Sequence, residues 1–289
     1  MAILFSENQL NFARKKYYGK FYFNDKNINI LKATFNKILI LIYNIKVSLI
    51  NKKRYIFRNI TKPAVQKSNN HLKIELNVKG SNLEALSNKL KNNNCAFVEN
   101  FFDNKSYNQI LANWPNINFF EYRNKIIKSY SAGFRYANKK ILEKDLGTFN
   151  KNKIIKEFYD FLLSADFNKY INSILKFENS DFNIYSIGST IAGTDSYLIP
   201  HIDGVMKRGE SAYNFIYFVD GNDADIEFSG GTGIYEDADF EKPLLIPSTL
   251  KNSILIYNSS HEFYHGFKLT KLPKNFYRKT INFQFFKSG

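Results

Sequence analysis

The chain has 289 residues, of which 44% are hydrophobic and 17% aromatic, and this composition excludes an intrinsically disordered protein. The formal net charge of +15 makes nucleic acid and anionic membranes candidate partners. The positive residues are mostly lysine, however, and the chain is also rich in Asn, Ile, Phe and Tyr, which is typical of a broad compositional bias. Nucleic acid is therefore the less favoured partner, because phosphate-reading surfaces favour arginine.

Cys95 is the only cysteine, which excludes an intrachain disulfide and favours a reducing, cytoplasmic location. The N-terminus lacks a basic region ahead of an apolar run, so we expect no signal peptide. The most membrane-like segment, residues 30–50, is interrupted by Lys32, Lys37 and Lys46 and is too short to be transmembrane. We predict an amphipathic helix packed on the protein, and a helix lying on a membrane surface is the second interpretation.

Residues 1–94 are basic and rich in asparagine, and we interpret them as an N-terminal basic extension, helical with one short strand. Alternating apolar and polar residues at 72–78 predict that strand. Ser81 and Glu84 have the spacing of a capping box and predict the start of a helix.

The main domain is predicted to cover residues 95–289 and to open with a short strand at Cys95. Asp103 is a typical N-cap and predicts a helix that stops before Pro115. Apolar residues at three- and four-residue spacing predict two more helices, at 153–163 and 167–177.

From residue 181 the pattern changes to short strand-like runs separated by Gly, Asn, Asp and Pro. Such runs indicate a sandwich or barrel, for example a double-sheet jelly roll. Because helices come first and strands afterwards, we predict an α+β fold with a double-stranded β-helix (jelly-roll) core at 181–289 and helices packed on one sheet. The strand-like runs are 183–188, 197–203, 213–220, 230–237, 244–248, 253–258 and 277–286.

His201 and Asp203 are the first candidate metal ligands. Side chains two residues apart on a strand point to the same side, so the imidazole and the carboxylate can bind one ion. A third ligand from a distant strand would complete a 2-His-1-carboxylate triad, which leaves positions open for substrate and O₂. Two histidines follow the strand at 253–258 and are candidates for this role, His261 and His265.

The last strand-like run, 277–286, is polar on one face and apolar on the other. Arg278, Thr280, Asn282 and Gln284 share the polar face. If this face lines a cavity, Arg278 can bind a carboxylate through a bidentate pair, with the Thr280 hydroxyl beside it. The alternative is a solvated edge strand with a surface arginine.

In this order, the H-x-D pair, the distal histidine followed by glycine and the arginine in RKTI resemble the Fe(II)/2-oxoglutarate-dependent dioxygenases, prolyl-4-hydroxylase-like branch. The resemblance covers residues 95–289. It implies His201, Asp203 and His265 as Fe(II) ligands, and Arg278 with Thr280 as the groups that bind 2-oxoglutarate. It also implies ascorbate as a reductant, and succinate and CO₂ as co-products.

Tyr185 resembles a tyrosine that assists cofactor binding in this family, although residues 189–196 look like an insertion before the metal strand. His265 is favoured over His261 because Gly266 follows it, as in the family's H-G element. Asp203 implies hydroxylation and not halogenation, because related halogenases have a small residue there.

We therefore expect an oxygenase that hydroxylates an unactivated C–H bond of a small molecule or of a peptidyl side chain, with O₂ as co-substrate. One alternative is a cupin-like metal-binding protein without 2-oxoglutarate chemistry. Another is a basic module that binds nucleic acid or an anionic surface. An acidic run favours either a cationic or polyhydroxylated substrate or, slightly preferred, a set of solvated turns. It comprises Asp220, Asp223, Asp225, Glu227, Glu236, Asp237, Asp239 and Glu241.

Overall fold

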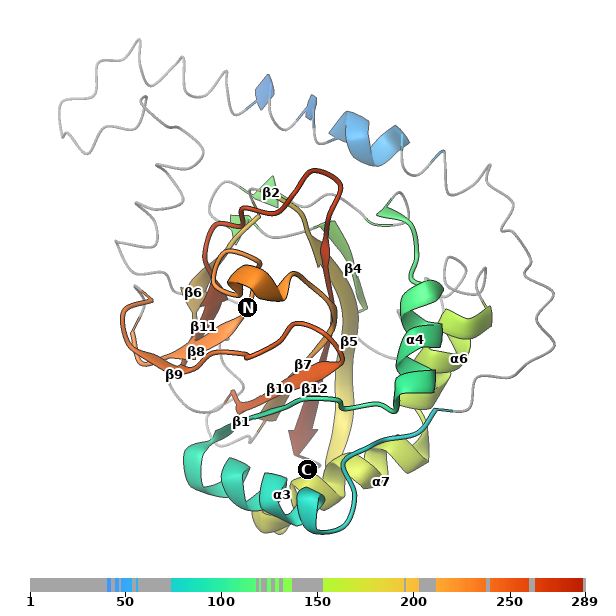
Figure 1. Cartoon of the computed structure of the whole chain (residues 1–289), viewed down its shortest axis with the longest axis vertical. Coiled ribbons are helices and arrows are strands. Elements are labelled where there is room, and N and C mark those ends of the chain that lie inside the picture. The colour runs from blue at the N-terminus through green and yellow to red at the C-terminus, as the bar shows by residue number, and fades with distance from the viewer. Residues whose placement is uncertain are drawn as a thin grey trace.

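The computed structural model describes residues 41–42, 45–46, 48–53, 56, 74–117, 120, 124–125, 128–129, 132–136, 153–194, 196–202, 212–237, 240–259 and 263–287. Its centre is a large antiparallel sheet with a smaller sheet against one face and helices against the other (Figure 1). The predicted combination of helices and antiparallel sheets is confirmed.

The large sheet has six strands in the order β1-β10-β7-β12-β5-β4, and the small sheet has four in the order β6-β11-β8-β9. The large-sheet strands are β1 (Cys95–Val98), β4 (Ala132–Tyr136), β5 (Phe182–Ala192), β7 (Ala212–Asp220), β10 (Ser253–Asn258) and β12 (Arg278–Lys287). The small-sheet strands are β6 (Leu198–His201), β8 (Gly233–Tyr235), β9 (Pro243–Leu245) and β11 (Tyr264–Phe267). A separate pair consists of β2 (Asn124–Lys125) and β3 (Lys128–Ser129).

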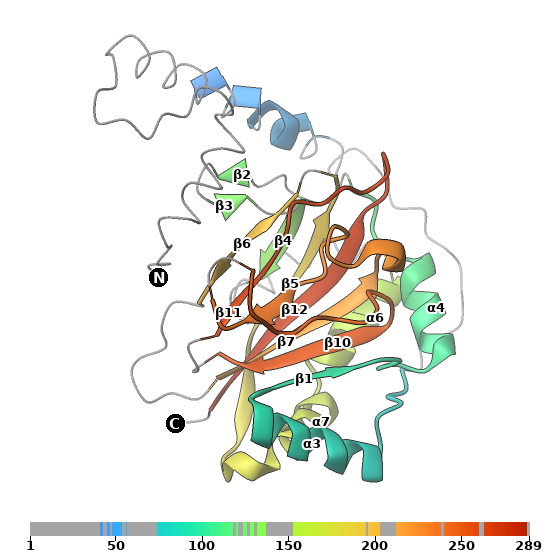
Figure 2. The ribbon, with the colours of Figure 1, turned by 60° about the vertical axis from the view of Figure 1, so that its left-hand side comes forward.

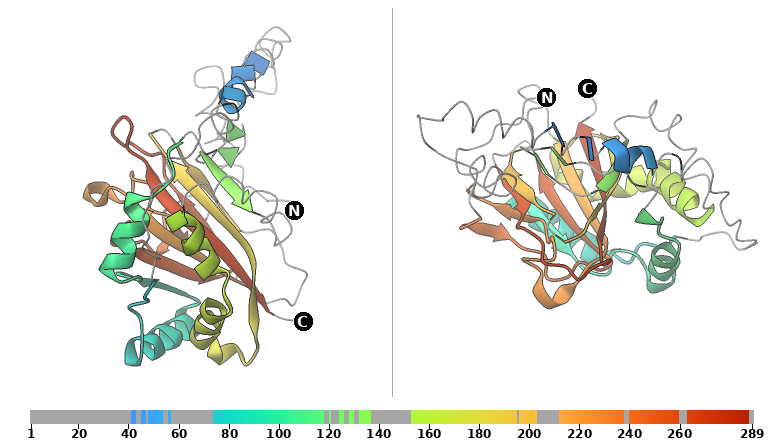
Figure 3. Two further views of the ribbon diagram at one scale, coloured as in Figure 1. Left: turned by 90° about the vertical axis from the view of Figure 1, so that its right-hand side faces the viewer. Right: turned by 90° about the horizontal axis from the view of Figure 1, so that it is seen from above.

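All seven strand-like runs after residue 181 contain a strand, as predicted. The long strands β5 and β12 lie side by side along almost their whole length (Figures 2 and 3). Residues 189–192 belong to β5, where they pair with β12 and Ala192 lies opposite Arg278. The insertion at 189–196 stays a prediction. Buried Ser189 hydrogen-bonds Tyr159 on the helical side of the sheet.

The large sheet separates two apolar cores. On β7, Phe215 and Tyr217 pack with the helices, while Ile216 and Phe218 pack against the small sheet. Because both faces of β7 are covered, its sequence is apolar almost throughout, as expected of a fully buried strand.

Four helices cover the outer face of the large sheet: α3 (Ser81–Asn93), α4 (Asn104–Ala112), α6 (Lys153–Leu162) and α7 (Ala165–Ile174). There are also two short 3₁₀ helices, η3 (Lys176–Glu178) and η4 (Asp223–Asp225). The predicted cap at Asp103 is confirmed, because its carboxylate accepts hydrogen bonds from the backbone N–H of Lys105 and Ser106.

The predicted capping box at Ser81 is wrong, although the helix begins there. Gly80 is the N-cap residue, at φ 56°, and no side chain caps this end of the helix. Of the predicted strand at 72–78, residues 72–73 lie outside the described residues, and the rest forms only an isolated bridge between Leu76 and Phe102. Residues 74–93, which the prediction assigned to the extension, pack into the helix-side core through Val78 and Leu90.

Every described position between 41 and 56 is helical (blue in Figure 1). The prediction that this helix packs on the protein is wrong for five of these positions, whose large apolar side chains are 47–61% exposed, whereas Ile50 is half-buried. The exposed apolar residues are Leu41, Ile42, Ile45, Leu49 and Ile56. Within the described part of the chain, no helix is long and apolar enough to cross a membrane.

Candidate active site

Two histidines meet on neighbouring strands of the small sheet. His201 at the end of β6 and His265 on β11 are partners in the strand register, and both are buried. Their ring centroids are 4.2 Å apart. The His265 ring also lies 5.1 Å from the ring of Tyr257, which belongs to β10 of the large sheet. The two imidazoles therefore point into the space between the sheets, where two neutral rings at this separation can bind one metal ion.

The third candidate ligand, Asp203, lies outside the described residues, as does His261. Among the residues that are described, no group of three or more His, Cys, Asp or Glu side chains could hold a metal ion. The structure thus brings together two of the three predicted ligands, and it places His265 rather than a residue of the preceding loop opposite His201.

Arg278 begins β12, a central strand of the large sheet, and is only 3% exposed. The alternative of a surface arginine on an edge strand is therefore wrong. Its Nη1 donates to the carbonyl oxygen of Gly230 at 2.7 Å and to the hydroxyl of Thr232 at 3.1 Å. The guanidinium carbon lies 4.4 Å from the ring centroid of Phe267, so the side chain reaches across to β11.

The Arg278 guanidinium carries a positive charge that nothing in the described part of the chain neutralises. No described carboxylate pairs with it, and its buried Nε has no hydrogen-bond partner among the described residues. Desolvation by burial lowers the pKa of Arg278 to about 9. The side chain is still cationic at neutral pH, and a buried unpaired charge is unfavourable unless an anion approaches it.

Thr280 follows Arg278 on the same face of β12 and is 1% exposed. Its hydroxyl lies 2.6 Å from the hydroxyl of Thr190, its register partner on β5. The predicted division of β12 is confirmed, because Ile281 and Phe283 pack into the helix-side core while Arg278 and Thr280 face the small sheet.

A row of polar side chains crosses the large sheet on this same inner face. Tyr257, Asn214, Gln284 and Ser186 occupy consecutive register positions on β10, β7, β12 and β5. Asn214 donates to the Tyr257 hydroxyl at 2.8 Å, and Ser186 donates to Gln284 Oε1 at 2.9 Å. The row begins at Tyr257, the residue in contact with the His265 ring.

Tyr185 is not brought to this group. Its side chain is 52% exposed, and its ring lies 4.3 Å from that of Phe286 near the far end of β12. Tyr185 is five residues before Thr190 on β5, which corresponds to roughly 16 Å along the strand.

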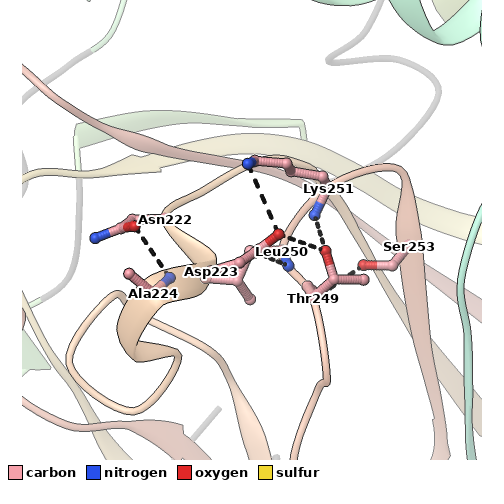
Figure 4. A network of polar contacts seen from close by, with 7 residues as sticks. All are labelled: Asn222, Asp223, Ala224, Thr249, Leu250, Lys251 and Ser253. Carbon is pink, nitrogen blue, oxygen red and sulfur yellow. Dashed lines mark hydrogen bonds and ion pairs between the residues drawn. The ribbon is translucent and has the colours of Figure 1, made fainter.

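The acidic run after β7 is largely used by turns. Asp223 accepts hydrogen bonds from the Leu250 N–H at 2.7 Å and the Thr249 hydroxyl at 2.8 Å (Figure 4). Lys251 lies 3.7 Å from the same carboxylate. Asp220, the last residue of β7, forms an ion pair with Lys279, so both acidic residues have structural partners. Asp223 fixes the segment that leads to Gly230 and Thr232.

The sequence interpretation missed Thr232, Phe267 and Tyr257 as parts of the site. Thr232 lies in a glycine-rich turn, and nothing local distinguishes it from other turn threonines. Tyr257 had a usable signal, because it alternates with Ile256 on a buried strand and brings a hydroxyl to the inner face.

No protein-family model and no curated protein matches the sequence. Similar folds occur in a prolyl hydroxylase from Trichoplax adhaerens, in complex with a hypoxia inducible factor peptide fragment, and in a Pseudomonas putida prolyl-4-hydroxylase. The first has a TM-score of 0.49, is 14% identical and covers 71% of this chain and 88% of its own. The second has a TM-score of 0.49, is 10% identical and covers 72% of this chain and 99% of its own.

A third similar structure is an oxidoreductase of the 2OG-Fe(II) oxygenase family from Burkholderia pseudomallei, with a TM-score of 0.46 and 11% identity. It covers 74% of this chain and 92% of its own. These three similar structures are thus two prolyl hydroxylases and a 2OG-Fe(II) oxygenase-family protein. Scores below 0.5 at this identity support no conclusion about activity, which has to follow from the side chains.

Proposed function

We propose that the protein is an Fe(II)- and 2-oxoglutarate-dependent oxygenase with a jelly-roll core, acting on a small molecule or a peptidyl side chain. The observation that carries the proposal is the buried guanidinium of Arg278, which no carboxylate among the described residues neutralises, in the same inter-sheet space as the His201–His265 pair. A cation in this position requires an anion, and paired imidazoles offer metal ligands.

The anion that fits is a small dicarboxylate. Arg278 would bind one carboxylate through its Nε side, and the Thr280 hydroxyl on the same face would donate a further hydrogen bond. Phe267, which stacks on Arg278, is two residues beyond His265 on β11, or about 7 Å along the strand. A second carboxylate near the histidines is therefore within the length of 2-oxoglutarate.

The metal site would consist of His201, His265 and Asp203. Two buried imidazoles on paired strands fit Fe(II), and the carboxylate two residues after His201 would add the third ligand if β6 continues its alternation. When bound, Fe(II) and 2-oxoglutarate supply the oxidation of an unactivated C–H bond, with succinate and CO₂ as co-products. The apolar residues around Tyr257 would keep bulk water away from the site.

The polar row supports a substrate with amide or hydroxyl groups. Asn214 and Gln284 can each both donate and accept hydrogen bonds, and they lie on the inner face beyond Tyr257. A neutral polar group of the substrate would exchange its water for these side chains. Asp220 and Asp223 are engaged by Lys279 and by the Thr249–Lys251 segment, so neither is needed for this binding.

The test is anaerobic titration of the purified protein with Fe(II) and 2-oxoglutarate, followed by visible absorption. We expect the weak charge-transfer band of the chelated metal in the wild type. Arg278→Met should weaken 2-oxoglutarate binding at least a hundredfold, because a charge-assisted bidentate pair is lost. Lys279→Met is the matched control, since it removes a cation from the neighbouring residue, which pairs with Asp220 instead.

A folded wild-type protein that gives no band would overturn the proposal. If the protein binds metal but gives no band, and Arg278→Met leaves metal binding unchanged, the result would instead support the cupin-like alternative. His265→Ala separates the histidines from the arginine, because it should abolish the band through loss of metal while Arg278 stays in place.

A further inference from the structure

The described helical positions between residues 41 and 56 carry an apolar stripe whose presence the proposed function does not explain. A helix advances about 100° per residue, so Leu41, Ile42, Ile45, Leu49 and Ile56 fall within an arc of about 100°. All five side chains are 47–61% exposed. Exposed apolar side chains gathered on one side of a helix indicate a surface that binds a partner.

The charge around this stripe identifies the kind of partner. Residues 1–73 contain fifteen lysines and arginines but only two acidic residues, a net charge of +13 out of +15 for the whole chain. No acidic residue occurs between residues 26 and 74. The net positive charge is thus concentrated in residues 1–73. A general compositional bias would have spread it over the whole chain.

Lysines also lie at the edges of the apolar arc. Lys52 lies about 20° inside one edge and Lys53 about 20° beyond the other, and both side chains are exposed. Long lysine side chains in this position can extend their ammonium groups to lipid headgroups while the apolar residues enter the acyl boundary. A nucleic acid would use the lysines but would leave the five apolar side chains in water.

We propose that this helix docks the protein on an anionic lipid surface, lying in the plane of the membrane. Lys46, Lys52 and Lys53 interrupt the apolar residues, and no described helix is long and apolar enough to cross a bilayer, so insertion is confined to one face. Binding combines burial of the stripe with attraction of the basic residues to acidic headgroups.

The experiment measures sedimentation of the full-length protein with vesicles of phosphatidylcholine alone and with vesicles containing about a third phosphatidylserine. We expect binding to the acidic vesicles, weakening as the salt is raised from about 0.1 M to about 1 M. Ile45→Asp/Leu49→Asp should weaken this binding about tenfold or more. Lys52→Gln/Lys53→Gln should weaken it by about fivefold per charge.

Leu244→Asp is the matched control, because Leu244 on β9 is an exposed leucine outside the helix and should leave vesicle binding unchanged. All variants should keep the wild-type unfolding midpoint, since each replaces an exposed side chain. The proposal is overturned if the wild type ignores acidic vesicles, or if the double aspartate variant binds them as well as wild type. Lysine-dependent binding to duplex DNA that the aspartate variant retains, without vesicle binding, would overturn it in favour of nucleic acid.

Discussion

Replacing Arg278 with methionine should leave the ligand-free protein almost as stable as the wild type, although Arg278 is buried. Burial lowers the pKa of Arg278 far below its ordinary value, to about 9, which corresponds to a cost of about 5 kcal/mol for holding the charge in the folded state. Two hydrogen bonds, to Gly230 and Thr232, offset this by about 1.5–3 kcal/mol each. The two terms nearly cancel, so we expect a change within about 2 kcal/mol.

Urea unfolding of the two proteins at pH 7 measures this difference. The same experiment with 2-oxoglutarate and Fe(II) gives the functional counterpart, because a ligand at about a hundred times its Kd stabilises the folded state by about 2.7 kcal/mol. The wild type should gain that stability and Arg278→Met should not. A loss of more than about 4 kcal/mol in the ligand-free variant would refute the reasoning, since Arg278 would then behave like one member of a satisfied buried pair.

Three further outcomes follow from buried polar groups. Above pH 10 the free energy of unfolding should fall with pH, because burial raises the pKa of Tyr217 and only the unfolded state loses the proton. Tyr217→Phe should reduce this fall by about 1 kcal/mol between pH 10 and pH 11, measured by urea unfolding. Asn252→Ala should lower the free energy of unfolding by about 3–5 kcal/mol in the same assay at pH 7. The Asn252 amide accepts hydrogen bonds from the Phe102 N–H and the Tyr217 hydroxyl and donates one to the Phe102 carbonyl. A loss below about 1 kcal/mol would contradict this. Gly230→Ala should weaken 2-oxoglutarate binding about tenfold in the absorption titration. Gly230 has φ +87°, and an added Cβ would lie 3.2 Å from Arg278 Cδ. Unchanged binding would contradict this expectation.

The sequence predicted correctly those features that depend only on residues close together in the chain. The alternation on β12 was readable because neighbouring side chains on a strand point to opposite faces whatever their partners, and Asp103 was readable because an N-cap bonds its own helix. The capping box at Ser81 failed for a related reason. Gly80 adopts a positive φ of 56°, which glycine tolerates, and it occupies the N-cap position that the prediction gave to Ser81.

Features that depend on register between distant strands were not readable. The chain before and after His265 does not say that it pairs with His201, because that pairing is set by how β6 and β11 align in the small sheet. Phe267 and Thr232 join Arg278 only after the two sheets pack face to face. The packing of residues 74–93 was likewise missed, because Val78 and Leu90 are isolated apolar positions in a polar stretch and gain their partners from other helices.

The two-sided character of β12 has a consequence for how this sequence can change over time. Substitutions at Ile281, Phe283 and Phe285 are tolerated if they keep the volume and shape of the helix-covered core. Substitutions at Arg278 and Thr280 are tolerated only if they keep the charge or the hydroxyl group. Tolerance to mutation should therefore alternate with every residue along a single strand. The residues that pack against the helices can be substituted over time while Arg278 and Thr280 are kept. Most of the sequence can then diverge around a few retained residues.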